Sequence, residues 1–144
     1  MISKCGFVFA MAGMLFLSGC IQSVPEKMEK EAFLGEPFRL KISEAALIKS
    51  ENLTIEFTNV TEDSRCPSGS ACIWAGQVTA VARVSKEGRA LGNYSLTRMP
   101  GASLPAAIAF DRYSISLTAI DPYPETSRKI EKAEYVATFV VSRE

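Results

Sequence analysis

The stretch LTIEFT, residues 53–58, decides the fold class of this chain. Leu53, Ile55 and Phe57 alternate with polar Thr and Glu residues, and this period of two is typical of a β-strand with one buried face. The same alternation recurs along the chain, and no strong amphipathic helix interrupts it. It predicts further strands at residues 38–42, 78–84, 94–96, 113–119 and 135–141.

Turn-forming residues separate these runs. The segment 86–89 contains Gly88 and has the chemistry of a hairpin turn, whereas DPYP at 121–124 ends a strand because proline donates no ladder hydrogen bond. Residues 44–49 fit either a helical turn begun at Ser43 or a short strand, and the apolar run 106–110 is too short to assign. We therefore expect one all-β domain over residues 33–144, an antiparallel β-sandwich or a small partly open barrel of about six to eight strands.

Composition excludes several classes of function. The 144 residues contain no histidine, and 16 Lys and Arg balance 16 Asp and Glu. Histidine-based nucleophilic sites and histidine metal sites are therefore excluded, and no basic stripe is offered to nucleic acid. Glycoside hydrolysis needs only two carboxylates, but no spacing selects a pair among the acids expected in connections, Asp63, Asp111, Asp121 and Glu125. We expect no enzyme, no cofactor, no metal and no nucleic-acid partner.

The N-terminus has the pattern of an export signal. Lys4 precedes an apolar run at residues 6–17 that is shorter than the roughly 20 residues of a membrane span. Leu17-Ser18-Gly19-Cys20 then resembles the lipobox of prokaryotic lipoproteins. The resemblance implies a signal peptide at residues 1–19, an acylated Cys20 that anchors the chain in a lipid bilayer outside the cytoplasm, and a tether at residues 20–32. An ordinary signal peptide, or a buried helix, with Cys20 there by chance, is the alternative.

Of the four cysteines, Cys5 leaves with the signal and Cys20 carries the lipid on its sulfur, so Cys66 and Cys72 are the free thiols that remain. In an exported protein such an isolated pair is expected to form a disulfide. Two reduced buried thiols are the alternative, and a tetrahedral metal site lacks ligands. The closed ring is short, so it contributes roughly 2 kcal/mol and mainly fixes the shape of residues 67–71. The fixed loop either presents a surface to a partner or only shapes a connection between strands.

The residues around this pair resemble a known pattern. DSRCP at 63–67 and CIWAG at 72–76 are similar to a motif of uncharacterised prokaryotic exported proteins and lipoproteins, D-S-R-C-P followed by C-x-W-x-G. The similarity extends over most of residues 33–144. It implies an exported β-domain and supplies no activity.

Individual residues of the motif carry physical expectations. Asp63 is expected to pair with Arg65 or to accept backbone N–H groups of the turn. Trp74 follows Cys72 by two positions, which predicts either a core anchor that shields the disulfide or a side chain that faces a ligand. The candidate partner-binding residues are Asp63, Arg65, Pro67, Gly69 and Trp74.

These observations favour a non-catalytic binding or structural module of the cell envelope, with a protein or a glycan as partner. The alternative is an inhibitor of an extracellular hydrolase that presents the Cys66–Cys72 loop, since a fixed loop lowers the entropy cost of binding.

Overall fold

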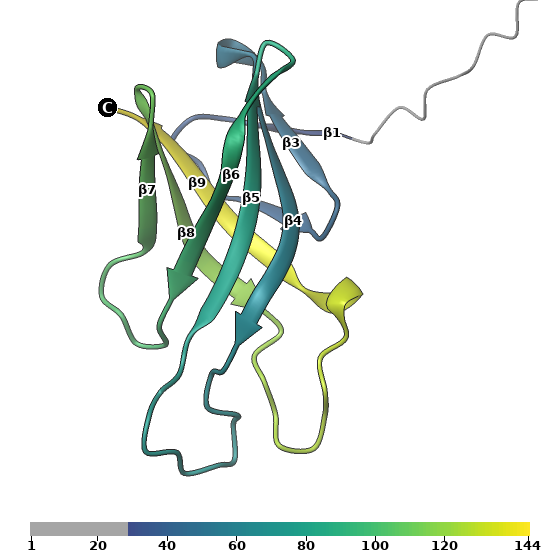
Figure 1. Cartoon of the computed structure of the whole chain (residues 1–144), viewed down its shortest axis with the longest axis vertical. Coiled ribbons are helices and arrows are strands. Elements are labelled where there is room, and N and C mark those ends of the chain that lie inside the picture. Colours follow the sequence, from purple (N-terminus) through teal and green to yellow (C-terminus); the bar gives the residue numbers. More distant parts are fainter. Residues whose placement is uncertain (1–28) are drawn as a thin grey trace, which may run out of the picture.

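The computed structural model describes residues 29–144 as two stacked β-sheets (Figure 1). The expected signal peptide, Cys20 and the tether up to residue 28 lie outside the described residues. The first sheet has the order β1-β3-β4-β5-β6 and the second the order β2-β9-β8-β7. The fold is therefore the β-sandwich that the alternating pattern predicts.

The strands differ in length from four to eleven residues. The first sheet is formed by β1 (Glu29–Ala32), β3 (Ala45–Ile48), β4 (Leu53–Asp63), β5 (Val78–Lys86) and β6 (Arg89–Arg98). The second is formed by β2 (Phe38–Lys41), β7 (Ala106–Phe110), β8 (Tyr113–Asp121) and β9 (Val136–Arg143). Two short 3-10 helices, η1 (Lys49–Glu51) and η2 (Lys132–Glu134), precede β4 and β9.

The core lies between the sheets and is built from the alternating apolar residues. Leu53, Ile55 and Phe57 of β4 are fully buried, as their spacing predicts. Phe57 meets Phe139 of β9 edge to face, with ring centroids 5.9 Å apart, which joins the centres of the two sheets. The predicted inward faces of residues 38–42, 78–84 and 135–141 also contribute buried side chains.

Three segments differ from expectation or resolve an open alternative. The predicted tether was wrong at its end, because residues 29–32 form β1, which pairs in parallel with β3 and buries Ala32. Residues 45–48 form a strand and not a helical turn, and residues 106–110 form β7 at a sheet edge. The nine strands of the described chain slightly exceed the predicted number because β1, β3 and β7 are among them.

A β-bulge changes the phase of β8. Tyr113, Ile115 and Leu117 are buried as predicted, but the pairing with β9 shifts between Leu117 and Ala119. The extra residue turns Ile120 inward in place of Ala119, since a bulge places two residues opposite one. Periodicity alone carries no sign of such an insertion.

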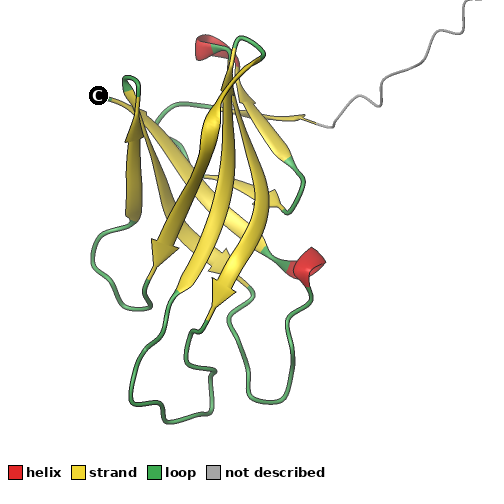
Figure 2. Ribbon diagram, viewed as in Figure 1, coloured by secondary structure: helices red, strands yellow, loops and turns green. Residues whose placement is uncertain are grey.

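The long connections gather at one end of the sandwich, called the loop end below (Figure 2). They are the β4–β5 loop (residues 64–77), the β6–β7 loop (99–105) and the β8–β9 connection (122–135). The opposite end carries tight turns, including the predicted hairpin, where Glu87 and Gly88 have φ of 51° and 76°. Within residues 29–144 no helix is long and apolar enough to span a membrane.

Candidate functional site

The DSRCP motif begins at the end of β4 with a buried ion pair. Arg65 Nε donates to Asp63 Oδ1 at 2.7 Å, and Arg65 Nη2 donates to Oδ2 at 2.6 Å. The backbone N–H of Arg65 also donates to Asp63 Oδ1 at 3.4 Å. Both expected interactions of Asp63 are thus present in one arrangement, with the side chains only 9% and 4% exposed.

The same two side chains connect the first sheet to the second. Arg65 Nη1 donates to the carbonyl of Ile120 at 2.8 Å, and Nη2 donates to the carbonyl of Pro122 at 3.0 Å. On the other side, the Tyr135 hydroxyl donates to Asp63 Oδ2 at 2.9 Å. The guanidinium therefore supplies hydrogen-bond donors to two backbone carbonyls at the end of β8, where the pairing of β8 with β9 stops.

Burial and neighbouring charge shift two pKa values in this network. Burial raises the pKa of Asp63, but hydrogen bonds and charge from Arg65, with the Tyr135 hydroxyl, together bring it below its ordinary 3.8. Burial, then the hydrogen bond to Asp63 and its charge, raises the pKa of Tyr135 to about 12. At neutral pH the carboxylate is charged and the phenol is neutral, so every member of the network has its partner.

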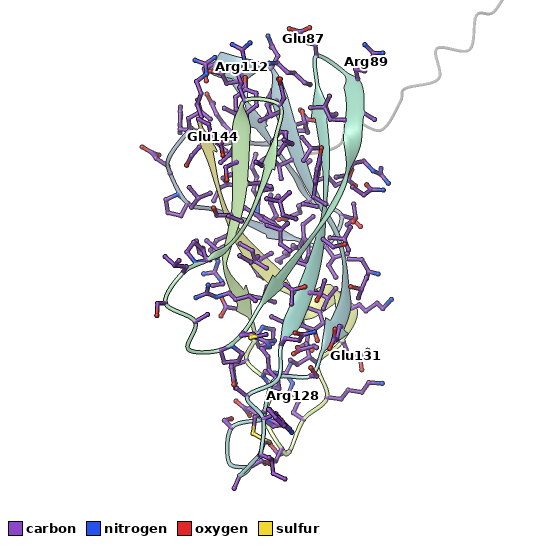
Figure 3. All side chains as sticks on the ribbon, turned by 60° about the vertical axis from the view of Figure 1, so that its left-hand side comes forward. Glu87, Arg89, Arg112, Arg128, Glu131 and Glu144 are labelled. Carbon is purple, nitrogen blue, oxygen red and sulfur yellow. A yellow bond between two sulfur atoms is a disulfide. The ribbon has the colours of Figure 1, made fainter. Side chains whose placement is uncertain are left out.

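The disulfide closes the β4–β5 loop beyond this network. Cys66 and Cys72 are bonded, with Cα atoms 5.9 Å apart, at the tip of the loop end (Figure 3). Below the ring the loop continues as a short ladder, in which Ser64 N–H donates to Gln77 at 2.8 Å and Cys66 N–H donates to Ala75 at 2.9 Å. The β4–β5 loop is therefore fixed by backbone hydrogen bonds where it leaves the strands and by the disulfide nearer its tip.

The ring also rests on the β8–β9 connection. Ser68 N–H donates to the carbonyl of Pro124 at 2.9 Å. Gly69 has a φ of 87°, and a Cβ there would lie 3.5 Å from the Thr126 hydroxyl oxygen. Pro67 is partly buried beside it. Pro67 and Gly69, two candidate partner-binding residues, thus shape the loop against its neighbour.

Of the two alternatives for Trp74, the core anchor was wrong. The indole is 81% exposed, and the side chain of Ile73 before it is 94% exposed. The chain bends at these two residues, so the alternation assumed after Cys72 does not continue, and both side chains point away from the sandwich. The space under the loop is occupied by Arg65, whose guanidinium lies 5.1 Å from the centroid of the Tyr123 ring.

Exposed apolar side chains concentrate at the loop end. Of the seven large hydrophobic residues exposed in residues 29–144, five lie in its three connections. Trp74 and Met99 line one surface cavity of about 340 Å³, which joins the β4–β5 and β6–β7 loops. We use the name loop-end patch for the four large apolar residues exposed in these two loops, Ile73, Trp74, Met99 and Leu104.

The acidic residues considered for glycoside hydrolysis are engaged elsewhere or lie apart. Asp63 binds Arg65, and Asp121 binds Arg39 at 3.0 Å. Asp111 lies in the tight β7–β8 turn at the opposite end. Glu125 lines the same surface cavity as Asp63, but the Asp63 carboxylate is held by Arg65, so the two do not form a free carboxylate pair. In the described chain no three His, Cys, Asp or Glu side chains group as metal ligands.

Sequence reasoning missed several members of this site. Tyr135 has the spacing of a core residue, and the carbonyls of Ile120 and Pro122 carry no side-chain signal at all. Ile73, Met99 and Leu104 are exposed because of the shape of their loops, and the alternation of apolar and polar residues does not predict loop shape. Comparison with family models, with curated proteins and with solved structures finds no match for this chain.

Proposed function

We propose that this chain is a membrane-anchored lipoprotein of the cell envelope whose β-sandwich binds a protein partner without catalysis. The observation that carries the proposal is the exposure of Ile73 and Trp74, at 94% and 81%, on a loop closed by a disulfide. Exposed apolar groups gathered at one place mark interaction surfaces, and Trp is enriched among the residues that dominate binding energy.

The chemistry of the loop-end patch favours a protein over a glycan. Ile73, Met99 and Leu104 supply aliphatic surface that gains from burial against another apolar surface, about 1.5–3 kcal/mol for each large side chain. A sugar stacks on an aromatic ring but needs fixed polar groups around it, and the patch is mainly apolar. The buried network below the loop fixes its position before binding, which lowers the entropy cost.

The decisive experiment compares what the full chain captures from envelope extracts with and without the patch. The double variant Ile73→Ala with Trp74→Ala is expected to lose the partner while unfolding at the same temperature as the wild type, because both residues are exposed. Phe33→Ala is the control, since Phe33 is also exposed but follows β1 and lies outside the three loops. A partner captured equally well by the double variant contradicts the proposal.

The lipid anchor has its own test. Cys20 follows Leu17-Ser18-Gly19, and lipid on its sulfur holds such a protein on a bilayer when two or more acyl chains are present. Cys20→Ser is expected to move the protein from the membrane fraction to the soluble fraction. Firm membrane attachment of this variant contradicts the lipoprotein assignment.

Inhibition of an extracellular hydrolase is the second candidate. It is favoured by the disulfide-closed loop, whose residues 68–75 are exposed at the tip of the molecule. In that case the double variant Cys66→Ala with Cys72→Ala abolishes inhibition of the target enzyme, because the loop loses its fixed shape. Full inhibition by this variant rejects the loop-inhibitor hypothesis.

A further inference from the structure

A cavity of about 260 Å³ lies between the sheets at the loop end. It is bounded by the first residue of β5, the last residue of β6 and the last four residues of β8. The lining residues are Arg65, Val78, Arg98, Pro100, Thr118–Asp121 and Tyr123. Neither Ile73 nor Trp74 lines this cavity, so it is a site separate from them.

The charges around the cavity leave one cation without a partner. Arg65 is neutralised by Asp63, and its remaining donors bind two backbone carbonyls. Asp121 is paired with Arg39. Arg98 forms no ion pair within residues 29–144, and its Nη1 atom is buried with no hydrogen-bond acceptor there. A guanidinium stays charged at all ordinary pH values, so this donor requires an acceptor.

The rest of the lining defines what that acceptor can be. The Thr118 hydroxyl already donates to the carbonyl of Thr138 at 3.1 Å, so it offers the cavity only an acceptor. Val78, Pro100 and Ala119 are apolar. A guanidinium matches a planar carboxylate by paired N–H donors, and a single uncompensated positive charge fits a monoanion better than a doubly charged phosphate. The volume is below that of sites for drug-sized molecules, so the ligand is small.

We propose that this cavity binds a monocarboxylate with a compact apolar body, its carboxylate paired with Arg98. The carboxylate is either that of a free small acid or the terminal carboxylate of a protein segment. The inference goes beyond the proposed function and does not depend on it, because the loop-end patch and the cavity use different side chains.

The test uses the full chain in a non-ionic detergent and follows backbone amides of Val78 and Ala119 by NMR. Benzoate represents the free acid, and benzamide is its neutral counterpart of the same shape. An acetylated tripeptide ending in Val, with a free or an amidated C-terminus, represents a protein segment. Saturable binding of either carboxylate at millimolar concentration, with its neutral counterpart at least about tenfold weaker, is the expected result.

Substitutions then assign the binding to Arg98. Arg98→Gln is expected to weaken carboxylate binding about tenfold or more, and Arg98→Lys to restore only part of it because lysine lacks the paired donors. Arg89→Gln is the control, because Arg89 is on the same strand at the opposite end of the sandwich (Figure 3). An unchanged unfolding temperature establishes that Arg98→Gln has kept the fold. If its unfolding temperature is lowered, the test is the comparison of benzoate with benzamide on the wild type.

The outcomes separate the sources and the failures. Tighter binding of benzoate indicates a free acid, and tighter binding of the tripeptide carboxylate indicates a protein terminus. Equal binding of the charged and neutral probes, or no binding of either carboxylate, overturns the proposal. A crystal structure grown with the tighter-binding of the two carboxylates that shows only a water molecule on Arg98 Nη1 overturns it as well. Loss of partner capture by the Ile73 and Trp74 variant leaves these results unaffected.

Discussion

Arg65 donates two parallel hydrogen bonds, of 2.7 Å and 2.6 Å, to the carboxylate of Asp63, and both side chains are almost completely buried between the sheets. The two residues are only two positions apart, so the pair forms locally at the end of β4. The remaining donors of Arg65 bind backbone carbonyls at the end of β8, about 55 residues further along the chain. A local motif thus fastens two distant parts of the sandwich.

Asp63→Ala is expected to destabilise the fold by about 3–5 kcal/mol, because it leaves the Arg65 guanidinium buried without its counter-charge. The matched control is Asp121→Asn, which breaks another Arg–Asp pair whose side chains are more than half exposed. That control is expected to change stability by no more than about 1 kcal/mol. Urea unfolding monitored by circular dichroism measures both. Equal effects would show that burial does not decide the strength of the Asp63 pair.

Acid is expected to weaken the fold through the same carboxylate. The pKa of Asp63 is lower in the folded chain than its ordinary 3.8, so the unfolded chain binds the proton more readily. The stabilisation is therefore complete above the ordinary pKa and is lost as the pH falls through the folded pKa. Urea midpoints measured from neutral pH to about pH 2 are expected to fall less steeply in Asp63→Asn than in the wild type. Parallel curves contradict this assignment.

The sequence predicts the part of this site that is local. The spacing of Asp63 and Arg65 indicates their ion pair, and the cysteine spacing indicates the disulfide. The sequence contains no signal for Tyr135 or for the carbonyls that Arg65 binds, because those contacts join residues 55 to 72 positions apart. They depend on the packing of the sheets.

The fold follows the same division. Strand periodicity places the buried faces, since each alternating run has only one apolar side. The bulge after Leu117 and the bend at Trp74 break that periodicity without a distinctive residue type. Both departures lie next to the loop end, so the candidate site is where prediction from the sequence was least accurate.

Alkali is expected to weaken the fold through Tyr135. Its pKa is raised to about 12 in the folded chain from an ordinary value of 10, so the unfolded chain loses the proton first. This contribution is complete below pH 10 and is lost as the pH rises toward 12. Tyr135→Phe is expected to remove this loss and to cost about 1–2 kcal/mol at neutral pH, because the hydrogen bond to Asp63 disappears. Absorbance of the phenolate and urea unfolding at matched pH measure the two effects.

Removal of the disulfide is expected to have a moderate effect. Cys66 and Cys72 are six positions apart, and closing so short a ring contributes roughly 2 kcal/mol. Cys66→Ala with Cys72→Ala should therefore lower stability by that amount, while the Asp63–Arg65 pair and the sandwich persist. Urea unfolding gives the energy, and amide exchange at Ser68 and Ser70 reports the local loosening. Collapse of the whole fold in this variant would assign the disulfide a larger role than its ring size allows.

Gly76→Ala is expected to displace the β4–β5 loop from its base. Gly76 has a φ of 71°, and a Cβ there would lie 1.8 Å from the carbonyl oxygen of Ser64, which is backbone and cannot rotate away. The matched control is Gly88→Ala, where φ is 76° but nothing lies within 4 Å of the added Cβ. Both variants carry the strain of a left-handed conformation, about 1–2 kcal/mol, so the difference between them isolates the steric clash.

The clash adds to that strain in Gly76→Ala alone, and a total of about 3 kcal/mol or more is expected from urea unfolding. The hydrogen bonds from Ser64 to Gln77 and from Cys66 to Ala75 should open with it, because they flank the crowded carbonyl. Faster amide exchange at Ser64 and Cys66, with unchanged exchange in the β5–β6 hairpin, is the expected local signature. Equal destabilisation by the two glycine substitutions would mean that the base of the loop shifts freely to relieve the clash. The loop would then not hold Trp74 in a fixed position.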